Sequence, residues 1–213
     1  MEFLQSTFIL LFILFPSVIL HECAHGWAAY RLGDPTAKLA GRLTLNPLKH
    51  IDPLGTIILP GILLIMRALG YSTFVLGWAK PVPVNFSNLR HPRRDMMIVG
   101  LAGPVVNIGL AVLATLIIKT CSFLEIGLLD PVAEMMANAI FINLLLAVFN
   151  LMPIPPLDGS RLVAGVLPRR LAFLYARMEP YGILIVMVLL YLGVLNRIVF
   201  PLVEFFFHHL INF

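Results

Sequence analysis

Four apolar segments, each long enough or nearly long enough to cross a lipid bilayer, constrain this sequence most. A transmembrane helix needs about 20 mostly apolar residues. The segments run over residues 3–30, 96–118, 131–152 and 181–207. Asn196, Arg197 and Pro201 interrupt the last segment, which therefore fits either one kinked helix or two shorter elements.

The composition favours the same class of protein. Hydrophobic residues make up 60% of the chain and charged residues 12%, whereas soluble domains are about half apolar and about 25% charged. We therefore predict an all-α, multi-pass integral membrane protein with four to six transmembrane helices, in a single domain over residues 1–213 that ends in a helical region over about 178–207. The net charge of +4 does not indicate nucleic-acid binding, because basic residues of membrane proteins collect in cytoplasmic loops.

A fifth apolar stretch, Pro53–Met66, is too short for an ordinary crossing and carries Pro60 and Gly61 at its centre. We expect a re-entrant or interfacial hairpin there. If this stretch does not cross, 13 of the 15 Lys and Arg residues lie on one side of the membrane. The positive-inside rule then places that side in the cytoplasm, which fits the inner membrane of a cell.

Within residues 38–45, Leu39, Leu43 and Leu45 alternate with Lys38, Arg42 and Thr44. Such a period of two is typical of a strand with one buried face. Val82–Phe86 is a second short candidate, which Pro81 and Pro83 would confine to an edge. We therefore predict a small membrane-associated β-strand or re-entrant region between the first two core helices.

The motif His21-Glu22-Cys23-Ala24-His25 lies in the last third of the first apolar segment. Residues four apart share a helix face, so both imidazoles can bind one metal ion. Glu22 stands where it can take a proton from a metal-bound water, and H-E-x-x-H is the zinc metalloprotease signature. Ionisable residues at membrane depth mark functional sites, which favours a site over an unused polar cluster.

Catalytic zinc takes three protein ligands and one water, so a third ligand is needed. Asp158 is the preferred candidate, because it follows the third apolar helix in a proline-rich loop and emerges on the same side of the membrane as His25. It could instead cap the helix that follows. The other candidate ligands are Asp52, His50, His91, His208 and His209.

Four tracts resemble the site-2 protease family of intramembrane zinc metalloproteases. They are HECAH at 21–25, GLAGPVVN at 100–107, NLMPIPPLDG at 150–159 and GWAKPVPVN at 77–85. The last tract is similar to short members of bacterial type, without a PDZ or CBS domain. The resemblance covers nearly the whole chain. The tracts at 21–25, 100–107 and 150–159 are three motifs in a fixed order, which is far more specific than one motif.

The resemblance implies a role for individual residues. His21, His25 and Asp158 would bind one Zn²⁺, and Glu22 would be the general base. Asn150 would position the substrate or stabilise the oxyanion. Gly103 and Asn107 would pack their helix near the catalytic one, and the residue types by themselves favour a helix-packing hydrogen bond for Asn107.

The expected substrate is a transmembrane segment of another protein, cleaved in or near the bilayer. An edge strand can hold an unwound segment by strand addition. The residues we predict for this contact are Lys38, Leu39, Arg42, Leu43 and Leu45. Two other functions fit some of the features, namely a metal-binding transporter and a catalytically inactive relative that binds helices. Neither nucleic-acid binding nor a particular oligomeric state is predicted.

Overall fold

The computed structural model describes residues 2–70, 77, 79–125, 127 and 130–212, and over that part of the chain it contains helices and no strand. The α-helices are α1 (Glu2–Arg31), α2 (Thr36–Leu39), α3 (Leu59–Ala68), α4 (Pro92–Phe123), α5 (Asp130–Asn150), α6 (Gly159–Val166), α7 (Arg169–Ala176), α8 (Gly182–Tyr191) and α9 (Phe200–Asn212). Short 3-10 segments are η1 (Pro47–Lys49), η3 (Phe86–Asn88) and η4 (Glu179–Tyr181), and π-helical segments are η2 (Pro53–Ile58) and η5 (Leu195–Val199). The all-helical prediction is confirmed for the described residues.

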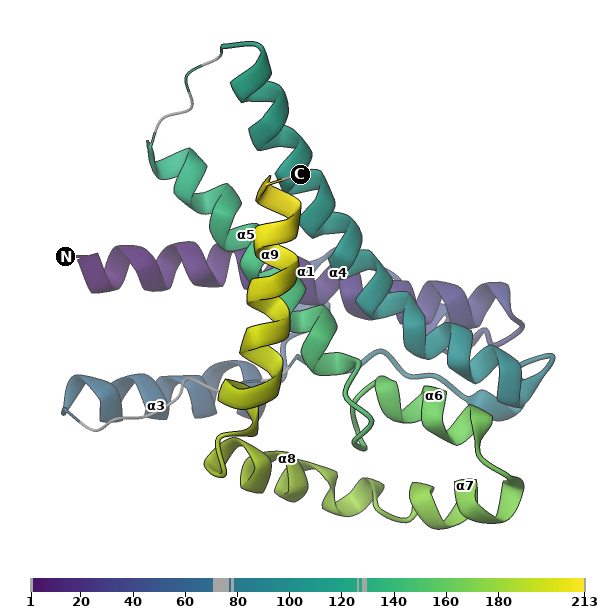
Figure 1. Cartoon of the computed structure of the whole chain (residues 1–213). Helices are drawn as coiled ribbons and strands as arrows, with labels where there is room; N and C mark the ends of the chain where they lie inside the picture. Colours follow the sequence, from purple (N-terminus) through teal and green to yellow (C-terminus); the bar gives the residue numbers. More distant parts are fainter. Residues whose placement is uncertain (1, 71–76, 78, 126, 128–129, 213) are drawn as a thin grey trace.

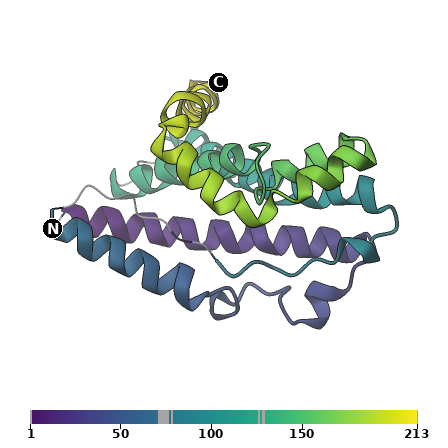
Figure 2. The same cartoon turned by 90° about the horizontal axis from the view of Figure 1, so that it is seen from below.

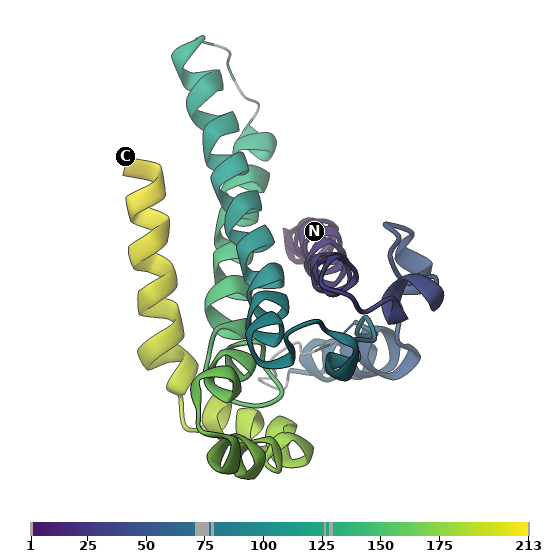
Figure 3. The same ribbon diagram turned by 90° about the vertical axis from the view of Figure 1, so that its right-hand side faces the viewer.

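An antiparallel pair, α4 and α5, forms the centre of the molecule, and α9 packs along α5 (Figure 1). Helix α1 crosses this pair rather than running along it, as the view in Figure 3 shows. Helices α6, α7 and α8 gather at the end of the pair where α5 finishes (Figure 1). Helix α3 stands to one side, next to η2 (Figure 2).

Small residues let the central helices approach closely. Ala111 and Ala114 of α4 are buried against Ile140 and Leu144 of α5, and Val199 and Val203 complete this cluster from the side of α9. A second cluster joins Ala28 and Ala29 of α1 to Val99 of α4. Alanine at helix crossings brings backbones together, which is how apolar helices pack in a membrane.

Three helical stretches among the described residues are long and apolar enough to cross a bilayer: Pro92–Phe123, Val132–Asn150 and Arg169–Tyr191. The chain is a membrane protein by this measure, and the total number of crossings remains a prediction. The C-terminal apolar segment consists of two elements, α8 and α9. The chain turns between them at Gly193, whose φ of +74° favours glycine.

The strand predicted over residues 38–45 is wrong. Lys38 and Leu39 lie in α2, and Gly41 then turns the chain with a φ of +63°. Such alternation predicts a buried apolar face, but Leu39 and Leu45 are 81% and 65% exposed while Arg42 is 8% exposed. Residues 82–85 are extended without a partner strand, and two of their N–H groups donate to the carboxylates of Glu22 and Asp34.

The stretch Pro53–Met66 is helical throughout and therefore forms no hairpin, while its re-entrant or interfacial placement stays a prediction. Pro60 and Gly61, where we expected the turn, lie in the first turn of α3. Proline cannot donate to the preceding turn, and the turn before it is π-helical, with the N–H of Leu59 donating to the carbonyl of Leu54. Asp52 caps the stretch, with its side chain accepting from the N–H groups of Leu54 and Gly55.

A buried aspartate ties the end of α1 to the segment before α4. Gly33 leaves the helix with a φ of +115°, and Asp34 follows with no exposed surface. The Asp34 carboxylate accepts hydrogen bonds from Thr36, Asn85 and Asn88. Burial alone would raise the pKa of Asp34, but these hydrogen bonds outweigh it, so the pKa is lowered and the carboxylate stays ionised.

Candidate metal centre and catalytic site

Helix α1 brings two imidazoles to one point at its crossing with α4. His21 and His25 are four residues apart, both are buried, and their Nε2 atoms are 3.0 Å apart. The rings meet edge to face with centroids 4.6 Å apart. The shared face predicted from the spacing is therefore present in the structure.

Asp158 reaches the same point from the loop that follows α5. Its Oδ2 atom lies 3.1 Å from the Nε2 atom of each histidine. Gly159 permits this approach, since a Cβ atom there would collide with the carbonyl oxygens of Leu151 and Met152. Asp158 stands at the N-cap position of α6 but makes no capping hydrogen bond, so the capping alternative does not describe its side chain.

Hydrogen bonds behind the imidazoles fix which ring nitrogen faces Asp158. Asn107 is fully buried, and its Oδ1 atom lies 2.9 Å from Nδ1 of His21. The carbonyl oxygen of Val99 lies 2.7 Å from Nδ1 of His25. Both neighbours on this side are acceptors, so each Nδ1 donates its proton to them and each Nε2 is the nitrogen that faces Asp158.

These three atoms form a donor set that suits a cation. If both rings are neutral, the two Nε2 atoms and the carboxylate oxygen, all within 3.0–3.1 Å of one another, repel unless a proton or a metal cation lies between them. Tetrahedral zinc with ligand distances of about 2.0–2.1 Å separates its ligand atoms by roughly 3.3 Å. Among the described residues, His21, His25 and Asp158 are the one group of His, Cys, Asp or Glu side chains placed to hold a metal ion.

Gly103 of α4 leaves the space that the two imidazoles occupy. A Cβ atom there would lie 2.5 Å from Cε1 of His21 and 2.5 Å from Nε2 of His25. Its predicted neighbour in the motif, Asn107, is one turn further along the same face. Both residues thus pack α4 against the histidine face of α1, and Asn107 also orients a ring, which we had not predicted.

The Glu22 side chain does not share the hydrogen-bond partners of the two histidines. Its Oε2 atom accepts a hydrogen bond of 2.8 Å from the backbone N–H of Val82. Asn150 is the last residue of α5, and its amide nitrogen donates to the carbonyl of Leu146, one turn earlier. The structure therefore places Asn150 at the start of the loop that carries Asp158, without a hydrogen bond to the three ligand atoms.

The other candidate ligands lie elsewhere. Asp52 caps η2, His50 lies within hydrogen-bonding distance of the carbonyl of Thr44, and His91 precedes α4. His208 and His209 lie near the end of α9. None of these five residues belongs to the cluster found in the described chain.

The predicted substrate-binding residues are scattered rather than aligned. Lys38 donates to the hydroxyl of Tyr30, and Leu39 and Leu45 are exposed. Leu43 packs near Gly26 of α1. Their role in substrate binding stays a prediction, without the strand that motivated it.

We did not predict two backbone groups of the site, the carbonyl of Val99 and the N–H of Val82. Every residue carries such groups, so no sequence signal marks them.

Comparison with known proteins gives concordant matches. The model of peptidase family M50 matches residues 123–193. A Bacillus subtilis protein named "Putative zinc metalloprotease YwhC" is 34% identical over 92% of this chain and 85% of its own length. "Putative zinc metalloprotease Rip2" of Mycolicibacterium smegmatis is 35% identical over 90% of this chain and 70% of its own length. No solved structure matches.

The match to the Bacillus subtilis protein spans nearly all of both chains, including the segments that carry the two histidines and the aspartate. It agrees with a donor set that suits zinc and with helices apolar enough to cross a membrane. Neither the transporter nor the inactive relative is favoured by these findings. The chain belongs to peptidase family M50, the site-2 protease family of intramembrane metalloproteases, and is a zinc metalloendopeptidase.

Proposed function

We propose that His21, His25 and Asp158 hold one Zn²⁺ and that Glu22 is the general base of peptide hydrolysis. The observation that carries the proposal is the convergence of two Nε2 atoms and one carboxylate oxygen within 3.0–3.1 Å. Bound zinc supplies Lewis-acid polarisation of the peptide carbonyl and lowers the pKa of water toward neutrality.

The protein side chains perform the proton transfers. Glu22 follows the first ligand directly, so its carboxylate can take the proton of the attacking water. The same carboxyl group then gives that proton to the nitrogen of the leaving amine. Asn150 donates a hydrogen bond to the developing oxyanion, or orients the substrate, once its amide leaves the carbonyl of Leu146.

The substrate is a transmembrane segment of another membrane protein, which must unwind locally before attack because a helix engages its own carbonyls. Support comes from the setting of the site, where α1 crosses α4, a helix apolar enough to span a membrane. The side that carries most Lys and Arg faces the cytoplasm, and the site lies toward that side of a cell's inner membrane. Residues 1–213 form the single domain that performs this reaction.

The substitution Glu22→Gln tests the assignment of the base. The measurement uses proteoliposomes with a tagged single-span membrane protein that the wild type cleaves, here termed the reference substrate. The variant should keep one zinc per chain and lose cleavage by at least about a hundredfold, the usual contribution of a general base. Full cleavage by this variant would remove Glu22 from the mechanism.

A further inference from the structure

An extended segment lies against the side of α1 that carries Glu22. We call residues 79–83 of this segment the strap. The strap lies between α3 and η3 in the chain and leads toward η3 (Figure 2). Val82 is its buried residue, with 7% of its surface exposed. Gly26 of α1 allows this close packing, since a Cβ atom there would lie 2.7 Å from Cγ1 of Val82 and 2.7 Å from Cδ2 of Leu43.

The strap offers a single backbone donor next to the catalytic carboxylate. Pro81 and Pro83 have no N–H, so Val82 alone can donate from residues 81–83. Its N–H lies 2.8 Å from Oε2 of Glu22. A hydrogen bond to an ionised group is about twice as strong as a neutral one, and it restricts the carboxylate to one orientation.

A buried arginine joins the strap to the loop between α2 and η1, residues 40–46. Arg42 is 8% exposed, and its guanidinium donates to the carbonyl of Lys80 at 2.6 Å and to that of Pro81 at 3.3 Å. No carboxylate pairs with it among the described residues. Burying an arginine without a carboxylate partner costs free energy, which its hydrogen bonds to the two backbone carbonyls offset only in part.

A second set of contacts anchors the same loop to α1 beside Glu22. The N–H of Lys80 donates to the carbonyl of His50, which is fully buried, at 2.9 Å. The thiol of Cys23, the residue after Glu22, donates to the carbonyl of Thr44 at 3.2 Å. The loop is therefore connected to the strap through Lys80 and to the catalytic helix through Cys23.

We propose that the N–H of Val82 positions the Glu22 carboxylate for proton transfer, and that Arg42 acts as a positioning residue by holding the strap in place. The inference rests on the proposed role of Glu22 as base. With Oε2 held by the strap, Oε1 is the oxygen that takes the proton from water. The hydrogen bonds of Val82 and Arg42 in the described structure do not go to the three ligand side chains, so we expect zinc binding to persist without them.

The substitution Val82→Pro removes the N–H and leaves an extended backbone, since the neighbouring prolines already impose that conformation. It should lower kcat for the reference substrate by roughly ten- to a hundredfold, the value of a hydrogen bond to a charged group. KM and the zinc content should stay within about twofold of wild type. Val84→Pro is the matched control, because no hydrogen bond of the Val84 N–H occurs in the described structure, and it should keep the wild-type kcat.

Arg42 gives a second test that does not depend on an added proline. Arg42→Gln should lower kcat in the same way at constant zinc content, and Arg42→Lys should recover most of it, because an ammonium group can still donate to the carbonyl of Lys80. A readout without turnover is amide hydrogen exchange of the peptide 79–85. The Val82 amide should exchange faster in Glu22→Ala than in wild type.

The outcomes separate this inference from the proposed function. Wild-type kcat in both Val82→Pro and Arg42→Gln, with Glu22→Gln inactive, would overturn the role of the strap and leave Glu22 as base. Loss of zinc in both variants would show a general structural role and would equally overturn the inference. Full activity of Glu22→Gln would reject the base itself, and the positioning role with it.

Discussion

At the scale of single residues, the metal centre depends on groups that touch the two histidines without being ligands. Asn107 and the carbonyl of Val99 set the tautomer of the imidazoles, and Gly103 leaves room for both rings. Such partners orient metal ligands and raise their basicity, and their loss typically weakens metal affinity by about 10- to 100-fold. We therefore expect the geometry of α4 to contribute to zinc binding together with the motif on α1.

The substitution Gly103→Ala should abolish or strongly weaken zinc binding. Its methyl group would lie 2.5 Å from atoms of both imidazoles, so at least one ring must move away from the other ligands. Zinc per chain in the purified protein measures the effect. Gly109→Ala on the same helix is the control, since its methyl group meets nothing within 4 Å, and it should bind one zinc. Equal zinc content in both variants would contradict the account.

Much of the site was predictable at this scale, for definite physical reasons. The spacing of His21 and His25 equals one helical turn, and the position of Asp158 after a returning helix placed it on their side. Asn107 was expected to pack helices and proved also to be an acceptor for His21. The N–H of Val82 was not predictable, because only the path of the backbone brings it to Glu22.

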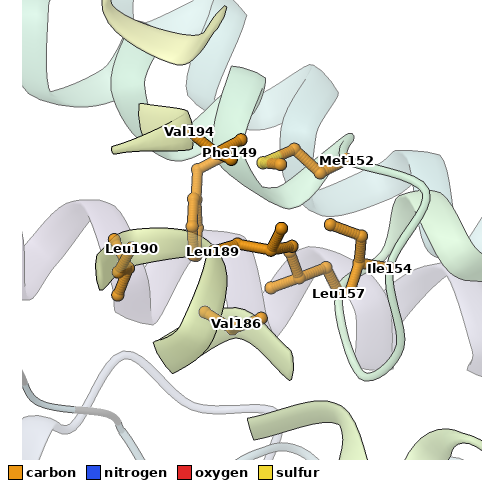
Figure 4. A pocket seen from close by; sticks show the side chains of 8 residues that line it. All are labelled: Phe149, Met152, Ile154, Leu157, Val186, Leu189, Leu190 and Val194. Atoms are coloured by element: carbon orange, nitrogen blue, oxygen red, sulfur yellow. The ribbon is translucent and has the colours of Figure 1, made fainter. Parts of the chain in front are cut away.

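At the scale of elements, α8 supports the loop that presents Asp158. Figure 4 shows an apolar hollow between α8 and this loop, into which Ile154 and Leu157 point beside Val186 and Leu189. Gly182 at the start of α8 lets the helix approach, because a Cβ atom there would collide with the carbonyl of Pro155. The position of Asp158, the proposed third ligand, is thus linked to the packing of α8.

The substitution Gly182→Ala should destabilise the protein by about 1–3 kcal/mol, the usual range for an overpacked site. It should also lower the zinc affinity, because the loop of Asp158 must shift away from α8. Thermal unfolding in detergent, followed with and without added zinc, checks both effects. Gly61→Ala in α3 meets nothing within 4 Å and should be neutral or slightly stabilising. Unfolding at the same temperature in the two variants would argue against this link.

The prediction of elements succeeded where the length of an apolar run determines the structure. It failed where the structure depends on which side chains are buried. The long helices α1, α4 and α5 follow from runs of about 20 apolar residues, which is the length of a membrane-spanning helix. The strand at 38–45 failed because period-two alternation implies a buried face only if the leucines are buried. Here Leu39 is exposed and Arg42 is buried, since its guanidinium holds the strap.

At the scale of the whole molecule, the site joins parts of the chain that are far apart in sequence. His21 and His25 lie near the N-terminus and Asp158 more than a hundred residues later. Helix α4 crosses α1 and pairs with α5, so it sets the distance between the two halves of the donor set. A metal ion bound there would stabilise the assembled fold, because the ligands converge only when these helices pack.

The central claim is that His21, His25 and Asp158 form one zinc site, and zinc per chain in detergent-purified protein tests it most directly. Wild type and Asp52→Ala should each hold one zinc, because Asp52 caps η2 and is remote from the donor set. Asp158→Ala should hold much less, since it removes one of three ligands and no helix-capping hydrogen bond. A full zinc in Asp158→Ala, or none in well-folded wild type, would contradict the account.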